Sequence, residues 1–359
     1  MSELSNLKAT KTLPQFARIL DLDGQTVSYA LYWYKRRNPY EHFTIPKKNG
    51  GVRHIAAPNS RLKVVQSRLA ELLGRIESEM ELKRTTKARV LSHGFKKGFS
   101  IITNANQHRN KRWVFNVDIR DFFPSINFGR VYGFFLKDRN FQLDPKIATI
   151  IAQIACYQNE LPQGSPCSPV ISNLITHILD IKLNKLANEL HCTYTRYADD
   201  LTFSTNEKEF PERIARLVRG SDDKWVAGDG LSYLIYRAGF QLNHEKTRMQ
   251  RRDSRQDTTG LIVNQKLNVR HEYYKQVRAM CHHLFNHGFA YSGPSKVPVS
   301  NHTLEGMLSF IYQIRRIKKP ELLFGACPVG RRFRPEHDRH KFSKCRRIFG
   351  SDEIKCQRT

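Results

Sequence analysis

The stretch YTRYADDLTFST, residues 194–205, has two adjacent aspartates near its centre. Apolar and polar residues alternate on both sides of Ala198-Asp199-Asp200. This two-residue period predicts a β-hairpin with both aspartates at the tip. Adjacent aspartates are ordinary at a turn, because aspartate tolerates turn geometry and bonds to nearby amides. Taken alone, this stretch predicts a turn and no chemistry.

A further carboxylate on an apolar strand changes that interpretation. The sequence WVFNVDI, residues 113–119, is β-branched and aromatic, which predicts a buried strand with Asp118 near its end. On neighbouring strand ends, Asp118, Asp199 and Asp200 would repel one another unless cations lay between them. Two Mg²⁺ ions about 3.5–4 Å apart, held by such oxygens, are the standard device for in-line attack on a phosphorus atom. We therefore expect the three aspartates to be catalytic and to hold two Mg²⁺ ions.

The composition indicates the class of partner. Of 359 residues, 60 are Lys or Arg and 33 are Asp or Glu, which leaves a formal net charge of +27. Because 40% of the residues are hydrophobic and 11% aromatic, the chain is expected to fold, and its excess charge points to nucleic acid. A ribosomal or chromatin-type binder would share this charge, so the charge alone indicates no activity.

The seven cysteines include no CxxC pair, which argues against a disulfide framework or an ordinary zinc ribbon. One short stretch, with Cys327, His337, His340 and Cys345, could bind metal, but its spacing matches no standard site. The sequence shows no export signal and no membrane-spanning run, so the expected location is a reducing cytoplasm, with no membrane partner.

Periodicity predicts most other elements. Two short extended runs around Lys47-Lys48-Asn49-Gly50-Gly51 predict a β-hairpin with a basic tip. Apolar residues at helical spacing predict helices over residues 13–37, 61–82, 168–190, 271–288 and 302–316.

Four boxes follow one another along the chain: FNVDI at 115–119, LPQGSP at 161–166, YADD at 197–200 and GFQLNHEKT at 239–247. This ordered set resembles the boxes of reverse transcriptases, over about residues 40–320. The resemblance implies an α+β class with a right-hand polymerase fold of fingers, antiparallel-sheet palm and helical thumb. The implied domains are fingers and N-terminal helices at 1–112, palm at 113–265 (with about 128–165 returning to the fingers), thumb at 266–325 and a basic tail at 326–359.

The same resemblance implies roles around the metal ions. Ile119 joins the three aspartates as a metal-site position. Phe123, five residues after Asp118, stands where the family places a steric gate against a ribose 2′-hydroxyl, although core packing is the alternative for any phenylalanine. The other implied nucleotide-binding residues, each of which could instead be an ordinary exposed side chain, are Lys48, Arg53, Gln163 and Lys246. Arg53 suits phosphate through its planar fork, and Lys246 would supply charge or a proton to the leaving pyrophosphate.

Smaller motifs resemble bacterial retron reverse transcriptases. Asn104 and His108 form an NAxxH segment, Thr258-Thr259-Gly260 lies where that family carries Val-Thr-Gly, and residues 274–285 resemble its thumb helix. RNA contacts are thereby implied for Asn104, His108, Thr258, Thr259, Gly260, Lys275, Arg278 and His282. Asn104 and His108 could equally cap or brace local backbone.

A retron enzyme would bind a structured non-coding RNA, start from a guanosine 2′-hydroxyl and use dNTPs to copy part of that RNA. The implied product is a branched RNA–DNA hybrid, multicopy single-stranded DNA, from which host RNase H removes the copied template. The family also implies an effector protein partner in anti-phage defence and a bacterial cytoplasmic location.

Three alternatives stay open. Another bacterial reverse transcriptase, of diversity-generating or abortive-infection type, would share the four boxes. A non-catalytic RNA-binding scaffold would share the charge, but the intact carboxylates argue against it. An RNA-templated RNA polymerase would share the palm chemistry, and Phe123 argues against that.

Overall fold

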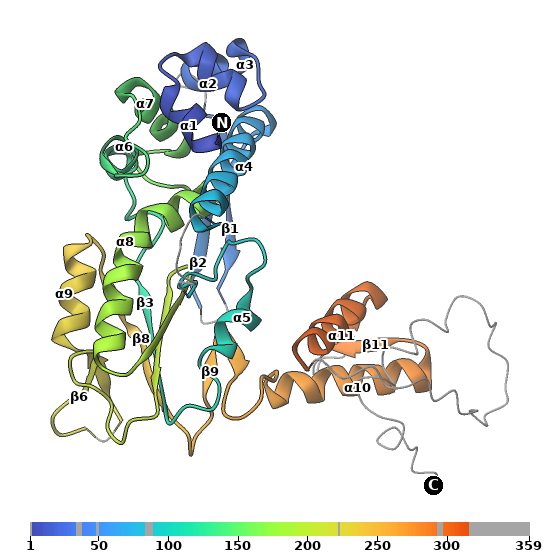
Figure 1. Cartoon of the computed structure of the whole chain (residues 1–359). Coiled ribbons are helices and arrows are strands. Elements are labelled where there is room, and N and C mark those ends of the chain that lie inside the picture. The colour runs from blue at the N-terminus through green and yellow to red at the C-terminus, as the bar shows by residue number, and fades with distance from the viewer. Residues whose placement is uncertain are drawn as a thin grey trace, which may run out of the picture.

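The computed structural model describes residues 2–33, 38–47, 50–82, 89–221, 223–292 and 297–315. Helices and strands mix in one tall body, from whose lower end α10 (His271–His287) and α11 (Asn301–Arg315) project to the side (Figure 1). The tall body contains the expected fingers and palm, and the projecting helices correspond to the expected thumb.

The palm is a four-stranded antiparallel sheet in the order β4-β5-β3-β8. Its strands are β3 (Trp113–Ile119), β4 (Thr193–Tyr197), β5 (Asp200–Thr205) and β8 (Leu242–Arg251). β3 pairs on both edges and is buried along nearly its whole length, as its sequence predicts. The helices α8 (Ser168–Glu189) and α9 (Asp229–Arg237) lie along one side of this sheet, and α8 contributes the buried apolar stripe expected of it (Figure 1). The predicted strand over residues 113–119, the hairpin over 194–205 and the helix over 168–190 are confirmed.

The fingers carry a second antiparallel hairpin, β1 (Tyr40–Pro46) and β2 (Val52–Pro58), which confirms the hairpin predicted around the basic turn. The hairpin is followed by α4 (Ser60–Leu82), which confirms the helix predicted over 61–82. The helices α6 (Phe128–Lys137) and α7 (Pro145–Ala155) pack against each other at the upper end of the body (Figure 1).

The single helix predicted over residues 13–37 is wrong. The described part of this region contains α2 (Leu13–Ile19), α3 (Gly24–Ser28) and a π-helical turn at Tyr29–Trp33, preceded by α1 (Glu3–Ala9). The break arises because Asp21 adopts a left-handed conformation (φ +55°) and the Asp23 carboxylate accepts a hydrogen bond from the Thr26 amide, which starts a new helix. The apolar period continues across the break because both helices face the same core.

The thumb helices contribute Val277, Met280, Leu308 and Ile311 to a second hydrophobic core, which they share with Ala105 of α5 (Ile101–Asn106), Val114 of β3 and Leu261 of β10 (Leu261–Ile262). Both helices lie within a residue of the predicted ranges and are confirmed. The remaining short elements are β6 (Ala215–Leu217), β7 (Trp225–Ala227), β9 (Asp257–Thr258), β11 (Ala290–Ser292) and β12 (Val297–Val299).

Some predicted sites lie outside the described residues. These are Lys48 and the basic tail with Cys327, His337, His340 and Cys345. Within the described ranges, no helix combines the length and apolar character needed to cross a bilayer.

Candidate active site

The three aspartates meet where β3 ends and the β4–β5 hairpin turns. Asp118 pairs directly with Asp200 across the antiparallel ladder, and the Ile119 amide donates a hydrogen bond to the Asp199 carbonyl oxygen at 2.9 Å. Ala198, at the hairpin turn, has φ +57°, in the left-handed region. The YADD sequence thus forms a tight turn that presents two carboxylates beside Asp118.

Burial and mutual charge disfavour ionisation of these groups. Burial, followed by the negative charge of Asp118, raises the pKa of Asp199. Burial, followed by the charges of Asp199 and Asp118, raises the pKa of Asp200 to about 7. Carboxylates with such raised pKa values are electrostatically unsatisfied, and the charge of a divalent cation would offset both the cost of burial and the mutual repulsion.

A lysine partly supplies this missing positive charge. The Lys246 Nζ lies 3.0 and 2.9 Å from the two carboxylate oxygens of Asp118, which is itself only 4% exposed. Partial burial acts to lower the pKa of Lys246, but its hydrogen bond to Asp118 and the neighbouring negative charges outweigh this and raise it. Asn243, from the same GFQLNHEKT box, also donates to Asp118, at 3.4 Å. The contact of Lys246 with pyrophosphate stays a prediction.

The donor set fits divalent metal ions in type. Within the residues that the structure describes, no three His, Cys, Asp or Glu side chains form a ready-made metal cluster. Asp118 instead directs both oxygens at Lys246, so metal binding here would require the ammonium group to withdraw. Hard carboxylate oxygens on adjoining strand ends are nevertheless the ligands that Mg²⁺ prefers.

The proposed nucleotide-binding residues lie on elements that are joined to each other. The Ala56 amide of β2 donates to the Gln163 carbonyl oxygen at 2.9 Å. Gly164 has φ +130°, and an added Cβ would lie 2.6 Å from the Ala56 carbonyl oxygen, so only glycine allows this approach. Arg53 is exposed on the same strand β2. The LPQG loop is therefore held against strand β2 of the basic hairpin.

Phe123 is half-buried, and its ring lies 5.9 Å from that of Phe95 and 5.3 Å from that of Phe122. Phe122 is buried and stacks on Phe240. Phe122 therefore packs in the core, while the side chain of Phe123 is partly exposed. Its gating role stays a prediction.

Sequence reasoning missed Arg196, which holds the YADD turn. The guanidinium group is fully buried, pairs with Asp180 of α8 at 2.7 Å and donates to the Ala198 carbonyl oxygen at 3.1 Å. On the other side of the turn, a Cβ on Gly94 would lie 2.6 Å from the Ala198 amide nitrogen. Two features of the sequence could have indicated this ion pair: Arg196 is a cation on a predicted strand, and Asp180 lies within the apolar stripe of a predicted helix.

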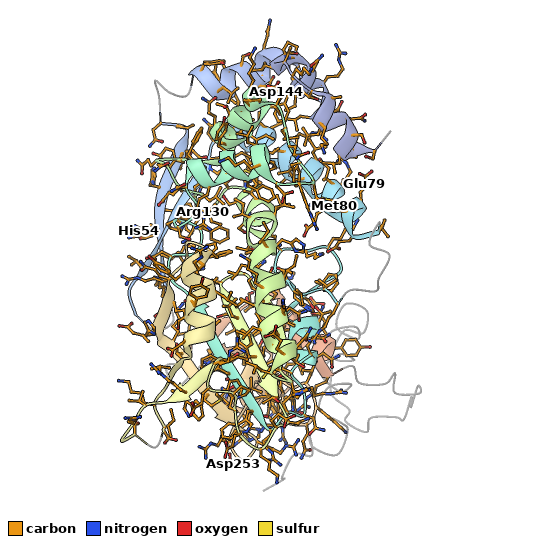
Figure 2. All side chains as sticks on the ribbon, turned by 60° about the vertical axis from the view of Figure 1, so that its left-hand side comes forward. His54, Glu79, Met80, Arg130, Asp144 and Asp253 are labelled. Carbon is orange, nitrogen blue, oxygen red and sulfur yellow. The ribbon has the colours of Figure 1, made fainter. Side chains whose placement is uncertain are left out.

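Arg130, which also escaped sequence reasoning, fixes the start of the GFQLNHEKT box (Figure 2). Its guanidinium group donates to the carbonyl oxygens of Ala238 and Gly239, each at 2.9 Å, and lies 4.1 Å from the centre of the Phe240 ring. It therefore ties α6 to the segment that leads into β8.

The structure corrects the RNA contacts predicted for three buried residues. Asn104 and His108 are 0% exposed, and so is Thr258 of the Thr258-Thr259-Gly260 box. The Thr195 hydroxyl donates to the Asn104 side-chain oxygen at 2.7 Å, and the His108 ring contacts the hydroxyls of both Thr195 and Ser204 at 2.7 Å. The NAxxH segment therefore braces the palm strands from inside, and none of these three side chains reaches the protein surface.

Other predicted RNA-binding residues lie at the surface. Lys275, Arg278 and His282 are exposed on α10, while Val277 and Met280 on the same helix are buried. Thr259 is half-buried and Gly260 is exposed in the β9–β10 turn. Their contacts with RNA stay predictions.

His108 provides a pH-dependent test of the internal brace. Burial lowers the pKa of His108 well below its usual value, so the folded protein keeps the ring neutral. The resulting stabilisation is present above the unfolded-state pKa of about 6.5 and is lost progressively as the pH falls from there toward the folded-state pKa. Between pH 7.5 and 5.5, wild-type protein should lose about 1.4 kcal/mol more unfolding free energy than His108→Gln protein. Denaturant titrations at the two pH values measure this, and parallel losses in both proteins would count against the brace.

Comparison with known proteins agrees with this geometry. The family model described as "Reverse transcriptase (RNA-dependent DNA polymerase)" matches residues 45–269. The Retron Ec86 reverse transcriptase of Escherichia coli is 33% identical, over 78% of this chain and 80% of that protein. The Retron Mx65 reverse transcriptase of Myxococcus xanthus is 35% identical, over 69% of this chain and 56% of that protein. Among solved structures, apo telomerase from Candida tropicalis aligns with a TM-score of 0.41 and 14% identity, over 69% of this chain and 61% of that chain.

The fold and the matched family model define the class as reverse transcriptase, which confirms the α+β, right-hand fold expected from the boxes. Within this class, the chain belongs to the retron reverse transcriptase family. The chain spans little more than half the length of the Mx65 and Mx162 relatives, at 56% and 57%, and 80% of the Ec86 relative.

Proposed function

We propose that this protein is an RNA-directed DNA polymerase of retron type. One observation carries the proposal. At the end of the palm sheet, Asp118 pairs with Asp200, and the Asp199 carbonyl oxygen accepts a hydrogen bond from the Ile119 amide, in a chain of this family. Two buried carboxylates whose pKa values are raised, Asp199 and Asp200, lie beside a third, and this arrangement serves a cation-dependent reaction better than it serves stability.

The aspartates would hold two Mg²⁺ ions, with the Ile119 carbonyl as a further ligand position. When bound, such ions lower the pKa of an attacking hydroxyl and neutralise a triphosphate. Arg53, on β2, and Gln163, whose carbonyl oxygen accepts from the Ala56 amide of β2, would bind and orient the incoming dNTP, and Lys48 would be a further phosphate-binding residue. Lys246 would leave Asp118 as the ions bind, and its charge would then serve the departing pyrophosphate.

The remaining steps follow from the family. The protein would bind a structured non-coding RNA, prime from a guanosine 2′-hydroxyl and make branched, RNA-linked single-stranded DNA. Host RNase H would remove the copied template, and an effector protein would complete an anti-phage complex in the bacterial cytoplasm. The domain boundaries implied by the sequence, with the palm at 113–265 and the thumb at 266–325, are part of this proposal.

Sequencing the nucleic acid that copurifies with the protein tests the proposal. A covalent RNA–DNA chimera, dependent on an RNA gene beside the coding sequence, is the expected result. DNA synthesis from arbitrary primers without such an RNA would favour a diversity-generating or abortive-infection type. No extension with Mg²⁺, dNTPs and copurified RNA would favour a binding scaffold.

The steric gate gives a separate prediction. Phe123→Ala protein should incorporate ribonucleotides more readily, because the ring that would collide with a 2′-hydroxyl is removed. A discrimination worth about 1–3 kcal/mol corresponds to about a 10- to 200-fold change in the dNTP to rNTP ratio of kcat/KM. Single-nucleotide extension measures the ratio, with Phe128→Ala as a control at another half-buried phenylalanine. An unchanged ratio in the Phe123→Ala protein would remove the gate.

A further inference from the structure

A basic surface lies at the opposite end of the palm sheet from the aspartates. Figure 2 shows Asp253, at this lower end, far from Asp144 at the upper end. Trp113 starts β3 here, and Asp118 lies five residues further along the strand. At about 3.3 Å per residue, the separation is roughly 17 Å, so this surface is outside the catalytic centre.

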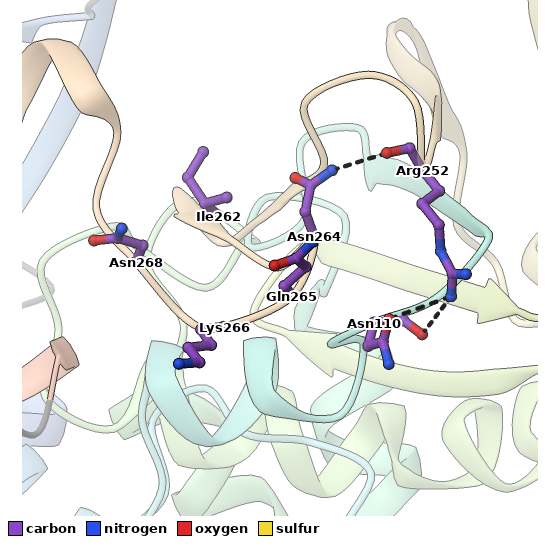
Figure 3. Close-up of a pocket in the computed structure, with 7 residues that line it drawn as sticks. All are labelled: Asn110, Arg252, Ile262, Asn264, Gln265, Lys266 and Asn268. Carbon is purple, nitrogen blue, oxygen red and sulfur yellow. Dashed lines mark hydrogen bonds between the residues drawn. The ribbon is translucent and has the colours of Figure 1, made fainter.

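Three loops form this surface, which we call the base surface. They are residues 109–112, 251–253 and 264–268, with Asn206 beside them. Between the loops lie two hollows of about 490 and 510 Å³, both lined by Asn110, Gln265 and Lys266. Figure 3 shows the first of them.

The cations of the base surface have no acidic partners. Among the described residues, no carboxylate forms an ion pair with its six basic side chains, which are Arg109, Lys111, Arg112, Arg251, Arg252 and Lys266. Nearby arginines behave differently, since Arg248, Arg255 and Arg270 all contact the buried carboxylate of Asp257, at 3.0 to 3.9 Å. Unpaired like charges on one surface repel one another, and a polyanion that displaces their counterions relieves this repulsion.

Two side-chain amides, of the buried Gln256 and the half-buried Asn264, hold the base surface together. Gln256 is 0% exposed and donates to the carbonyl oxygens of Lys111 and Arg112, at 3.1 and 3.3 Å. The Asn264 side-chain amide donates to the Arg252 carbonyl oxygen at 3.3 Å (Figure 3). The three loops are thus cross-linked before any ligand arrives, which lowers the entropic cost of binding.

Exposed amides add a specific hydrogen-bonding pattern. The Asn110 side-chain oxygen accepts from Arg252 at 3.3 Å, and that of Asn206 accepts from the Arg112 amide at 2.8 Å. Both oxygens are therefore occupied, which leaves the two amide NH₂ groups to donate outward. Such donors beside cations suit phosphate oxygens and 2′-hydroxyls, which an A-form RNA stem displays across its wide, shallow minor groove.

We propose that the base surface binds the sugar–phosphate backbone of a folded RNA stem, outside the copying site. The identity of the ligand as RNA rests on the proposed function. The stem would be held by phosphate and 2′-hydroxyl contacts at the lower end of the palm, while a different part of the RNA enters the site of the aspartates.

The test compares two variants that lose equal charge. Arg109→Gln/Lys111→Gln/Lys266→Gln alters the base surface, and Lys182→Gln/Lys185→Gln/Arg237→Gln alters exposed cations on α8 and α9. Fluorescence anisotropy with a labelled two-turn RNA duplex, over a range of KCl concentrations, measures affinity and its salt dependence. The base-surface variant should bind about tenfold or more weakly, with a salt slope smaller by about 2–3, and the α8–α9 variant should match wild type. A charge-retaining variant, Arg109→Lys/Lys111→Arg/Lys266→Arg, should restore binding.

Equal affinity of the two glutamine variants would overturn the proposal, as would binding of a DNA duplex of the same sequence by wild-type protein as tightly as the RNA duplex. The base-surface variant should also extend a saturating short primer–template at the wild-type rate, because its substitutions lie far from the aspartates. The proposed function fails separately, if wild-type protein binds the RNA duplex but extends no primer with Mg²⁺ and dNTPs.

Discussion

Asp199→Asn/Asp200→Asn protein should make no detectable DNA while it still binds RNA. Asparagine keeps the shape of the turn but removes both negative charges, so the site loses its hold on divalent cations. Losing several kcal/mol of transition-state stabilisation corresponds to a fall of at least about 10³-fold in the rate of primer extension. Extension assays with Mg²⁺ and dNTPs measure the fall, and anisotropy with the labelled RNA duplex checks binding.

The same substitution separates a catalytic role from a structural one. Because burial and neighbouring charges raise the pKa of Asp200 to about 7, its ionised form costs the folded protein stability as the pH rises above the unfolded-state value. At pH 8 without metal, the double variant should therefore be at least as stable as wild type. Asp223→Asn/Glu209→Gln, which alters two exposed carboxylates, is the matched control. DNA synthesis by the Asp199→Asn/Asp200→Asn protein at the control's rate would refute the catalytic assignment.

Arg196→Met should lower the unfolding free energy by about 3–5 kcal/mol, because it leaves the buried Asp180 carboxylate without its cation. It also removes the donor to the Ala198 carbonyl oxygen, so DNA synthesis should fall with stability. Arg196→Met/Asp180→Asn should recover part of the stability, because no uncompensated buried charge remains. Its rate should stay low, because the donor to the YADD turn is still missing. Denaturant titration and primer extension measure the two effects.

A surface ion pair provides the comparison for this prediction. Arg213 lies 3.8 Å from Glu189, and both side chains are about half exposed. Arg213→Met should cost no more than about 1 kcal/mol, because water screens the pair. If Arg196→Met cost no more than Arg213→Met, the buried network would not hold the turn.

The central sheet and the placement of the three aspartates could be predicted because they depend on local patterns. The two-residue period around Ala198-Asp199-Asp200 specifies a hairpin, and the β-branched run to Asp118 specifies a buried strand. The ordered boxes then indicate that these strands are neighbours, and the ladder between Asp118 and Asp200 agrees.

Other features could not be predicted because they depend on tertiary contacts or on single capping residues. The helical spacing of apolar residues over 13–37 does not reveal that the helix breaks at Asp21 and Asp23, because α2 and α3 bury their apolar residues in one core. The RNA contact of His108 was implied by the family resemblance, with a local brace as the alternative, and two hydroxyls on the palm strands satisfy the ring inside the protein. The pairing of Lys246 with Asp118 likewise arises from a β3–β8 ladder whose register shifts between Asn116 and Asp118.

Anomalous diffraction from crystals grown with Mn²⁺, a primer–template and a non-hydrolysable dNTP would show whether Asp118, Asp199 and Asp200 hold two divalent ions. Manganese substitutes for magnesium at oxygen sites and is visible by its anomalous signal. We predict two anomalous peaks between Asp118 and the Asp199–Asp200 turn, at about 2.1 Å from carboxylate oxygens, with Lys246 withdrawn from Asp118. An ordered nucleotide with no anomalous peak on these oxygens would contradict the account.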